Sequence, residues 1–332
     1  MSTYHKGFLV LSWILAGILL WGCSSQKNNL KSLEQGIEEV LSQAGPSVVS
    51  ISVKNQELSL EKVGSGVIID DQHVLTIENL LQNADEITIK LQNGEEITDS
   101  NIFISGCDFE TNLSLLHVEG KTLKSSKMAK EIKNGCLGIV LGNTEYSRGL
   151  QVNLGTIGIS WIGGVDGYDD NLLVLTSTHN ALYPGTPVFN CNAELIGLVE
   201  GKIEGEEQVV LLVPATTISE VSQILKRDGE IKRGWVGIIS NRICKKERVV
   251  ISDVIEGSPA HRAGLQKGDV VIACDGKEVY NGIELKKTIS KFQKGILINL
   301  KIQRDGKELI KKLTIDWAQN LPRKRRCPNR SI

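Results

Sequence analysis

Glu86-Ile87-Thr88-Ile89-Lys90-Leu91 is followed by Asn93-Gly94 and then by Glu96-Ile97-Thr98. Apolar and polar side chains alternate along the first of these stretches, as they do in a half-buried β-strand. Asn-Gly favours a tight hairpin turn, because both residues accept the positive φ angles that such a turn requires. The sequence therefore predicts a β-hairpin here. Similar short stretches lie on both sides of it, at residues 48–53, 66–69, 73–76, 101–105 and 113–118.

A second set of strand-like stretches follows a polar break at residues 121–134. These stretches are rich in Val, Ile and Leu, and a helical pattern over residues 217–227 closes the set. Many short strands at this spacing, joined by Gly-containing turns, favour closed barrels or sandwiches. We therefore predict a mostly β fold that contains two packed barrels. The second set comprises residues 136–141, 151–160, 172–176, 194–200 and 208–213.

Length and composition exclude several kinds of protein. A chain of 332 residues is long enough for two or three domains. Its formal net charge of −1 gives no general electrostatic attraction for nucleic acid, so no nucleic-acid partner is expected. The seven Cys and five His form no CxxC pair and no zinc-like spacing. We therefore expect neither a metal site nor a cofactor.

The first 23 residues are typical of an export signal. Lys6 precedes an apolar run from Phe8 to Trp21, which is too short to span a bilayer comfortably. Leu20-Trp21-Gly22-Cys23 resembles the bacterial lipobox, in which the Cys is lipidated and becomes the mature N-terminus. The alternatives are an uncleaved anchor or a plain signal peptide. In each case we expect the chain to be exported. If Cys23 is lipidated, we expect a membrane-anchored lipoprotein that faces the periplasm or the cell exterior.

Several motifs between residues 46 and 228 carry a family resemblance. Pro46-Ser47-Val48-Val49-Ser50-Ile51 and Gly64-Ser65-Gly66-Val67-Ile68-Ile69-Asp70 resemble two strands of the HtrA/Deg-type serine proteases, and Gly155-Thr156-Ile157-Gly158 resembles a third. The resemblance implies a chymotrypsin-like double β-barrel, followed by a PDZ domain. It also implies a serine-type endopeptidase, with catalytic Ser, His and Asp.

The three catalytic positions depart from that family. Asn79 stands where the family has its general-base His, and Asn112 stands where it has the Asp that orients the His. In the family, Pro-Gly is followed by Asn-Ser-Gly-Gly-Pro, and that Ser is the nucleophile. Here Pro184-Gly185 runs directly into Thr186-Pro187, so the residues that would carry the nucleophile and its oxyanion hole are missing. This pattern predicts a pseudoprotease with no catalytic residues.

A rearranged active site is the alternative to lost activity. His179 lies close in sequence to Thr186, and Cys191 follows shortly after, so a His–Thr or His–Cys pair is conceivable. The simpler reading is that His179 is a surface loop residue and that Cys191 belongs to a hairpin turn. We favour that reading.

Residues 229–317 resemble the PDZ domain of the same family. Gly234 precedes Trp235-Val236-Gly237-Ile238, which resembles the loop that binds a peptide carboxylate. Ser258 and Pro259 predict the start of a one-turn helix, and Asn281 with Glu284 predicts the start of a longer one. PDZ domains add an extended peptide to a sheet edge and hold its C-terminal carboxylate with backbone N–H groups. The peptide-binding candidates are therefore Trp235, Val236, Gly237 and Ile238, although Trp235 and Ile238 could instead be core residues.

These observations predict an envelope protein that binds unfolded or C-terminal peptide segments as a holdase, scaffold or sensor. One alternative is an active endopeptidase in envelope protein quality control. Another is a regulatory subunit that assembles with an active HtrA partner, and a homo-trimer would also fit the family. The expected division is a signal peptide at 1–23, a linker with a short helix at 24–45, the double barrel at 46–228, the PDZ domain at 229–317 and a basic tail at 318–332.

Overall fold

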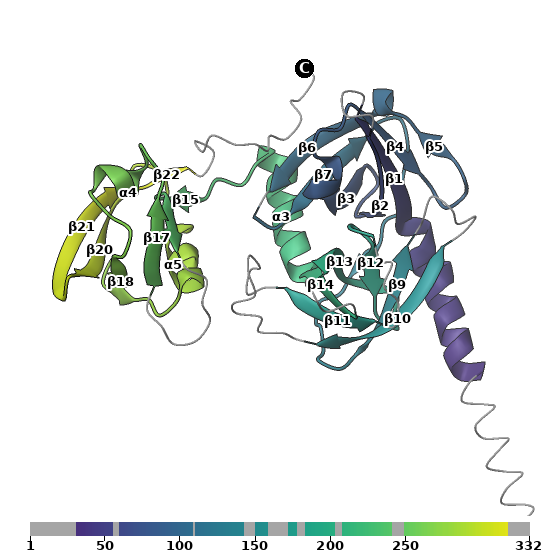
Figure 1. Ribbon diagram of the computed structural model, residues 1–332. Helices are drawn as coiled ribbons and strands as arrows, with labels where there is room; N and C mark the ends of the chain where they lie inside the picture. The colour runs from purple at the N-terminus through teal and green to yellow at the C-terminus, as the bar shows by residue number, and fades with distance from the viewer. Residues whose placement is uncertain are drawn as a thin grey trace, which may run out of the picture.

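The computed structural model describes residues 31–55, 60–108, 110–142, 150–158, 172–177, 183–202, 208–240 and 249–317. Two strand-rich barrels pack together, and a smaller unit follows α3 (Ala215–Asp228), as Figure 1 shows. A helix over residues 31–44 leads into the first barrel. No helix within the described ranges is long and apolar enough to cross a bilayer. The predicted lipidation site, Cys23, and the basic tail lie outside these ranges, as does His179.

The first barrel is a seven-stranded antiparallel sheet with the order β5-β4-β1-β2-β3-β7-β6. The hairpin predicted from Asn93-Gly94 is confirmed: β4 (Glu86–Lys90) pairs with β5 (Glu96–Ile97), and Gly94 has a φ of 86°. A 3-10 turn (Gly45–Ser47) precedes the first strand, and another (Asp99–Asn101) precedes β6. The remaining strands are β1 (Val48–Asn55), β2 (Leu60–Ile68), β3 (His73–Ile77), β6 (Ile102–Asp108) and β7 (Leu113–Val118).

The second barrel is also seven-stranded, with the order β12-β9-β10-β11-β14-β13-β8. An additional pairing between β12 (Pro187–Phe189) and β13 (Glu194–Lys202) brings the two ends of the sheet together. We did not predict β12, because we assigned its residues to the catalytic segment, nor β8 (Lys127–Met128), which lies in the polar break. The other strands are β9 (Leu137–Gly142), β10 (Gln151–Gly158), β11 (Leu173–Ser177) and β14 (Val209–Pro214).

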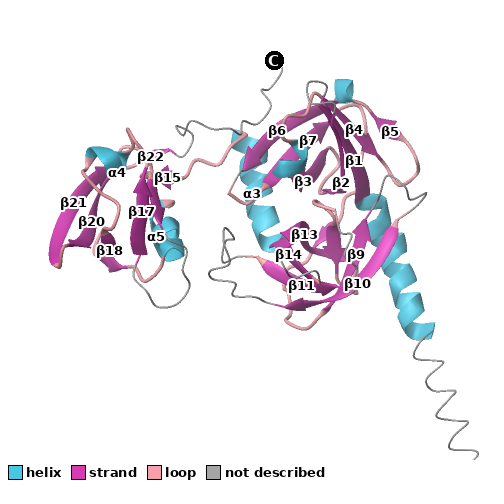
Figure 2. Cartoon of the chain, in the orientation of Figure 1, coloured by secondary structure: helices cyan, strands magenta, loops and turns pink. Residues whose placement is uncertain are grey.

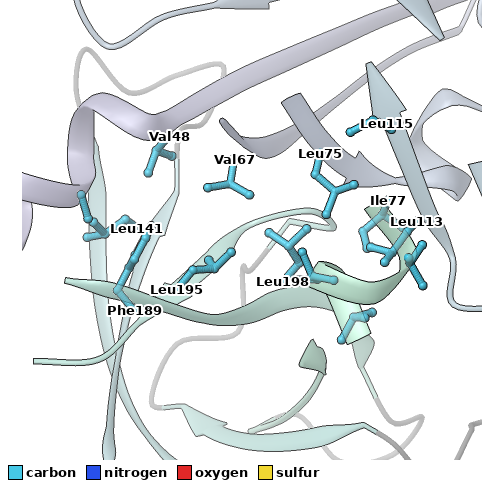
Figure 3. Close-up of a cluster of buried hydrophobic side chains, with 14 of the residues drawn as sticks. Val48, Val67, Leu75, Ile77, Leu113, Leu115, Leu141, Phe189, Leu195 and Leu198 are labelled. Carbon is cyan, nitrogen blue, oxygen red and sulfur yellow. The ribbon is translucent and has the colours of Figure 1, made fainter. Parts of the chain in front are cut away.

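One hydrophobic cluster holds the two barrels together. Val67 and Leu75 of the first barrel lie in the same cluster as Phe189 and Leu198 of the second, and all four are fully buried (Figure 3). The cluster also takes in Ile218 and Leu225 of α3. Burying a large apolar side chain stabilises a fold by roughly 1.5–3 kcal/mol. The interface between the barrels is therefore a packed core.

The C-terminal unit has its own core and mixes helices with strands (Figure 2). Its main sheet has the order β16-β17-β18-β20-β21, so β16 is an edge strand. The predicted helix starts are confirmed: Ser258 Oγ accepts from the His261 N–H at 3.1 Å, and Asn281 Oδ1 accepts from the Glu284 N–H at 2.8 Å. The helices are α4 (Pro259–Arg262) and α5 (Gly282–Ile289); the strands are β15 (Gly234–Trp235), β16 (Ile238–Ser240), β17 (Val249–Val254), β18 (Val270–Cys274), β19 (Lys277–Glu278), β20 (Leu297–Arg304), β21 (Lys307–Thr314) and β22 (Asp316–Trp317).

The connection between barrels and C-terminal unit is packed against the first barrel. A Cβ on Gly106, in β6, would lie 2.3 Å from the carbonyl oxygen of Gly229, so only glycine allows this approach. Cys107 forms an isolated β-bridge with Glu230. Arg233 then makes a two-pronged ion pair with Asp108, whose second oxygen accepts at 2.8 Å. This linker, residues 229–233, is therefore bound to the first barrel along much of its length.

Candidate functional site

The general-base position, Asn79, lies in α2 (Glu78–Leu81), directly after β3. The N-cap residue of this short helix is Ile77, which makes no side-chain cap. Asn112 supplies the cap from the loop before β7. Its carbonyl oxygen accepts from the Glu78 N–H at 2.9 Å, and its Oδ1 accepts from the Asn79 N–H at 3.0 Å. The structure thus brings Asn79 and Asn112, the two residues predicted to stand at catalytic positions, together through the backbone of Asn79.

Asn112 is held in a specific orientation between the two barrels. Its φ of 55° lies in the left-handed region, which Asn adopts more readily than most residues. Its Nδ2 donates at 3.2 Å to Oε1 of Glu200, which lies in β13 of the second barrel. The other oxygen, Glu200 Oε2, is buried and has no hydrogen-bond partner. Burial raises the pKa of Glu200 by more than the hydrogen bond from Asn112 lowers it.

The Pro184–Thr186 segment, where the family has its nucleophile, turns its backbone amides inward. The Gly185 N–H donates to the Val199 carbonyl at 2.8 Å, and the Thr186 N–H donates to the Tyr183 carbonyl at 3.2 Å. The Pro184 carbonyl accepts from the Ser65 N–H at 3.2 Å. Thr186 is only 2% exposed, so its hydroxyl is not presented to solvent, and Pro187 starts β12.

These three positions meet at one place. The Val199 N–H donates back to the Thr186 carbonyl at 2.9 Å, and the next residue is Glu200, which contacts Asn112. We call Asn79, Asn112, Gly185, Thr186 and Glu200 the triad-position junction. Glu200 cannot be identified from the sequence. The apolar pattern of residues 194–200 predicts a strand but does not indicate that the Glu200 side chain faces the other barrel. Within the described ranges, no three His, Cys, Asp or Glu side chains could hold a metal ion.

The residue considered for a rearranged site, Cys191, lies in a turn between β12 and β13. The Ala193 N–H donates to the Asn190 carbonyl at 3.0 Å and closes this turn, and Cys191 is an exposed free thiol. Our prediction of a hairpin turn is confirmed. A His–Cys or His–Thr pair with His179 involves a residue outside the described ranges.

The predicted carboxylate loop, Trp235 to Ile238, precedes and enters the edge strand β16. Gly237 has a φ of 83°, and a Cβ there would lie 2.2 Å from Ser258 Cβ. Both the φ and this contact require glycine. The Val236 and Gly237 carbonyls accept from Ala260 and Ile255 at 2.8 and 3.0 Å. Val236 is 3% exposed and belongs to the core, whereas Trp235 and Ile238 are partly buried.

The amides of this loop are directed differently from those of the Pro184–Thr186 segment. In the described part of the chain, no group accepts a hydrogen bond from the Gly237 N–H. Ile238 pairs with Val254, and the bond from the Ile255 N–H to the Gly237 carbonyl makes this a non-hydrogen-bonded pair. The Ile238 N–H therefore points away from β17, toward the open edge of β16. Two successive N–H groups can bind an anion there.

Helix α5 begins beside that open edge. A Cβ on Gly282 would lie 2.8 Å from Ser240 Oγ, at the end of β16. The first turn of α5 is held by Asn281, and Glu284 Oε2 accepts from the Tyr280 N–H at 3.0 Å. An edge strand and a helix start are thus adjacent, with the Gly237 and Ile238 amides at one end.

Comparisons with known proteins identify both parts of the chain. Residues 64–198 match the model of a trypsin-like peptidase domain, and residues 223–315 match the model of a PDZ domain. The serine endoprotease DegS of Haemophilus influenzae is 30% identical over 290 residues, which are 80% of this chain and 83% of that protein. A probable periplasmic serine endoprotease, DegP-like, of Ectopseudomonas mendocina is 28% identical over 274 residues. This chain spans about half the length of such DegP-like relatives, 56% in that case.

Solved structures show the same architecture. The serine endoprotease from Yersinia pestis superimposes with a TM-score of 0.70 at 25% identity, over 85% of this chain and 97% of the other. The HtrA-type protease AlgW with a decapeptide has a TM-score of 0.70 at 21% identity, over 85% of this chain and 98% of that one, and so supports the fold alone.

Proposed function

The chain belongs to the HtrA family of trypsin-like peptidases with a PDZ domain, and on that basis we propose that it is an envelope pseudoprotease that binds polypeptide C-termini. In this proposal the double barrel is a scaffold without peptidase activity. The PDZ domain holds the C-terminal carboxylate on the Gly237 and Ile238 amides. Its role is that of a holdase, scaffold or sensor for exposed chain ends.

The chemistry of the triad-position junction supports lost peptidase activity. A Ser nucleophile needs a neighbouring base to accept its proton, and the amide of Asn79 accepts none near neutral pH. Asn112 carries no charge that would stabilise a protonated base. Removing a triad in a related hydrolase costs on the order of 10⁶ in turnover.

The observation that carries the proposal is the direction of two pairs of backbone amides. Those of Gly185 and Thr186 are bonded within the second barrel, where an oxyanion hole would need them outward. The Ile238 N–H is directed to an open strand edge, where a peptide carboxylate would bind, and the Gly237 N–H beside it has no acceptor among the described residues. This difference supports an anion-binding role for the PDZ loop and, among the described residues, gives no such support for the Gly185–Thr186 amides.

Hydrolysis by purified residues 24–332 tests the first half of the proposal. We expect no turnover of casein or peptides and no labelling by a fluorophosphonate probe. The alternative, a serine-type endopeptidase like the named relatives, predicts turnover together with a label that maps to one residue. That outcome would reject the pseudoprotease reading and locate a rebuilt site.

Peptide binding tests the second half. We would measure the fluorescence polarisation of a library of labelled peptides with free C-termini, and of the same peptides with amidated C-termini. We expect binding that is lost on amidation, because the amide removes the charge that the two N–H groups recognise. Equal binding of both forms would contradict recognition of the carboxylate. If no peptide binds, co-purification with an active HtrA protease would favour the regulatory-subunit alternative.

The envelope location rests on the relatives, whose names place them in the periplasm, and on the N-terminal pattern. We propose that Cys23 carries a lipid anchor. Mass spectrometry of the mature N-terminus would detect diacylglycerol on Cys23, and Cys23→Ala should move the protein from the membrane to the soluble fraction or leave its signal uncleaved. An unmodified, cleaved wild-type N-terminus would contradict the anchor. Because homo-trimers are common in this family, we also propose that this protein forms a homo-trimer. Light scattering would measure its mass in solution.

A further inference from the structure

We infer that Glu200 has replaced the orienting acid of the triad from the opposite barrel, and that Asn112 and Glu200 together form a clasp that closes the former active-site junction. The contact joins residues 88 positions apart and links the loop before β7 to the end of β13. Glu200 acts here as a positioning residue, because its side chain bonds Asn112 among the described residues. The inference concerns how the junction is held and does not depend on peptide binding.

The first step of the argument is the orientation of the Asn112 amide. Its Oδ1 must face the Asn79 N–H, which donates to it at 3.0 Å. The NH₂ group then points to the other side, where Glu200 Oε1 accepts from it at 3.2 Å. A carboxylate at 112 would have no N–H to donate to Glu200 and would set one oxygen against another at this distance, which leaves a buried polar contact unmade. Asn112 and Glu200 therefore make sense only as a pair.

The second step is what the oriented amide does. Asn112 is 7% exposed and caps α2, whose own N-cap position is Ile77. Through Asn112, a side chain of the second barrel thus fixes the start of a helix in the first. Glu200 consequently controls the backbone around Asn79, the position where the family has its base.

The third step is the proton on Glu200. Oε2 is buried without a partner, and burial raises the pKa of this carboxyl. The other titratable side chains on the described elements that meet here are Glu78, which is 3% exposed, Asp108 and Glu110, which pair with Arg233, His117 on β7, and Glu194 and Lys202 on β13. None of them contributes to the shift of Glu200, whose causes are burial and the bond from Asn112. Burial and the bond from Asn112 therefore act on the Glu200 pKa in opposite directions, and burial has the larger effect.

The sign of the pH effect follows from this. Because its pKa is higher in the folded state, Glu200 contributes stability below its unfolded pKa of about 4.3 and loses it as pH rises through the folded value. Glu200→Gln keeps the acceptor for Asn112 and stays neutral at every pH. Relative to this variant, wild type should become progressively less stable as the pH rises above about 4.3.

The test is urea unfolding of residues 24–332 at several pH values, for wild type, Glu200→Gln, Asn112→Asp and the double variant. At neutral pH we expect Asn112→Asp to unfold more readily than wild type. Adding Glu200→Gln to this variant should lower its unfolding equilibrium constant about tenfold. Glu220→Gln, on the exposed face of α3, is the matched control and should follow wild type.

Parallel pH profiles for wild type and Glu200→Gln, or additive effects of the two substitutions, would overturn the clasp. If Asn112→Asp fails to fold alone, infrared difference spectra over a pH titration decide: wild type should show a protonated carboxyl band, absent in Glu200→Gln, that persists above the pH at which a free Glu carboxyl ionises. No difference in that band would also overturn the inference. Failure here leaves hydrolysis and peptide binding unaffected, so the two proposals are separable.

Discussion

Two glycine-containing turns with similar φ angles behave in opposite ways. Gly185, at 81°, and Gly237, at 83°, each sit in a loop that the family uses to bind a negatively charged oxygen. Around Gly185 the amides are bonded to Val199 and Tyr183, whereas the Ile238 N–H after Gly237 points to an open edge and the Gly237 N–H has no acceptor among the described residues. A turn conformation alone therefore does not make an anion site. What matters is whether the surrounding strands already use its N–H groups.

The largest effect should come from Gly185→Ala. A Cβ at this position would lie 2.1 Å from the Ser65 carbonyl oxygen, in addition to the strain of a positive φ. We expect a loss of about 3 kcal/mol in the free energy of unfolding, measured in urea. Gly94→Ala is the control, because Gly94 has a φ of 86° and no atom within 4 Å of the added Cβ; it should lose about 1 kcal/mol. Equal losses would mean that the inward packing of Gly185 contributes little.

The next effect should come from Ile238→Pro. Proline removes the N–H that points to the open edge and leaves the hydrogen bonds to β17 intact, because this residue is in a non-hydrogen-bonded pair. A hydrogen bond to a charged group is worth about 1.5–3 kcal/mol, so peptide affinity should fall about tenfold or more. Ile238→Ala, which keeps the N–H, separates this effect from the loss of the side chain. If both variants bind equally well, the Ile238 amide does not hold the carboxylate, and the contrast between the two turns loses its functional meaning.

The smallest effect should come from Asn281→Ala, at the other wall of the expected peptide site. It removes the cap of α5, which costs about 1 kcal/mol of stability. Peptide affinity should fall less than in Ile238→Pro, since only the helix start is loosened. Asn281→Asp restores a capping oxygen and should recover both properties. A larger affinity loss in Asn281→Ala than in Ile238→Pro would place recognition on α5 rather than on the amides.

The sequence predicts much of this architecture because its signals are local. Asn93-Gly94, Ser258-Pro259 and the Asn281–Glu284 pair each act within a few residues, and all three elements form as expected. The motif positions of Asn79 and Asn112 could likewise be read from the resemblance. Glu200 could not, because its partner is 88 residues away and a strand pattern does not specify which barrel a terminal side chain faces. The short strands β8 and β12 were not predicted. β8 lies in the polar break at residues 121–134, and β12 lies in the segment that resembles the catalytic loop.

The bound linker has a consequence for how far the PDZ domain can travel. Gly229 is pressed against Gly106, Glu230 bridges to Cys107, and Arg233 is paired with the buried Asp108. A free tether of this length would let its cargo sweep a wide volume. These three attachments restrict the movement of the PDZ domain relative to the first barrel. A chain end bound by the PDZ domain would therefore stay close to the first barrel.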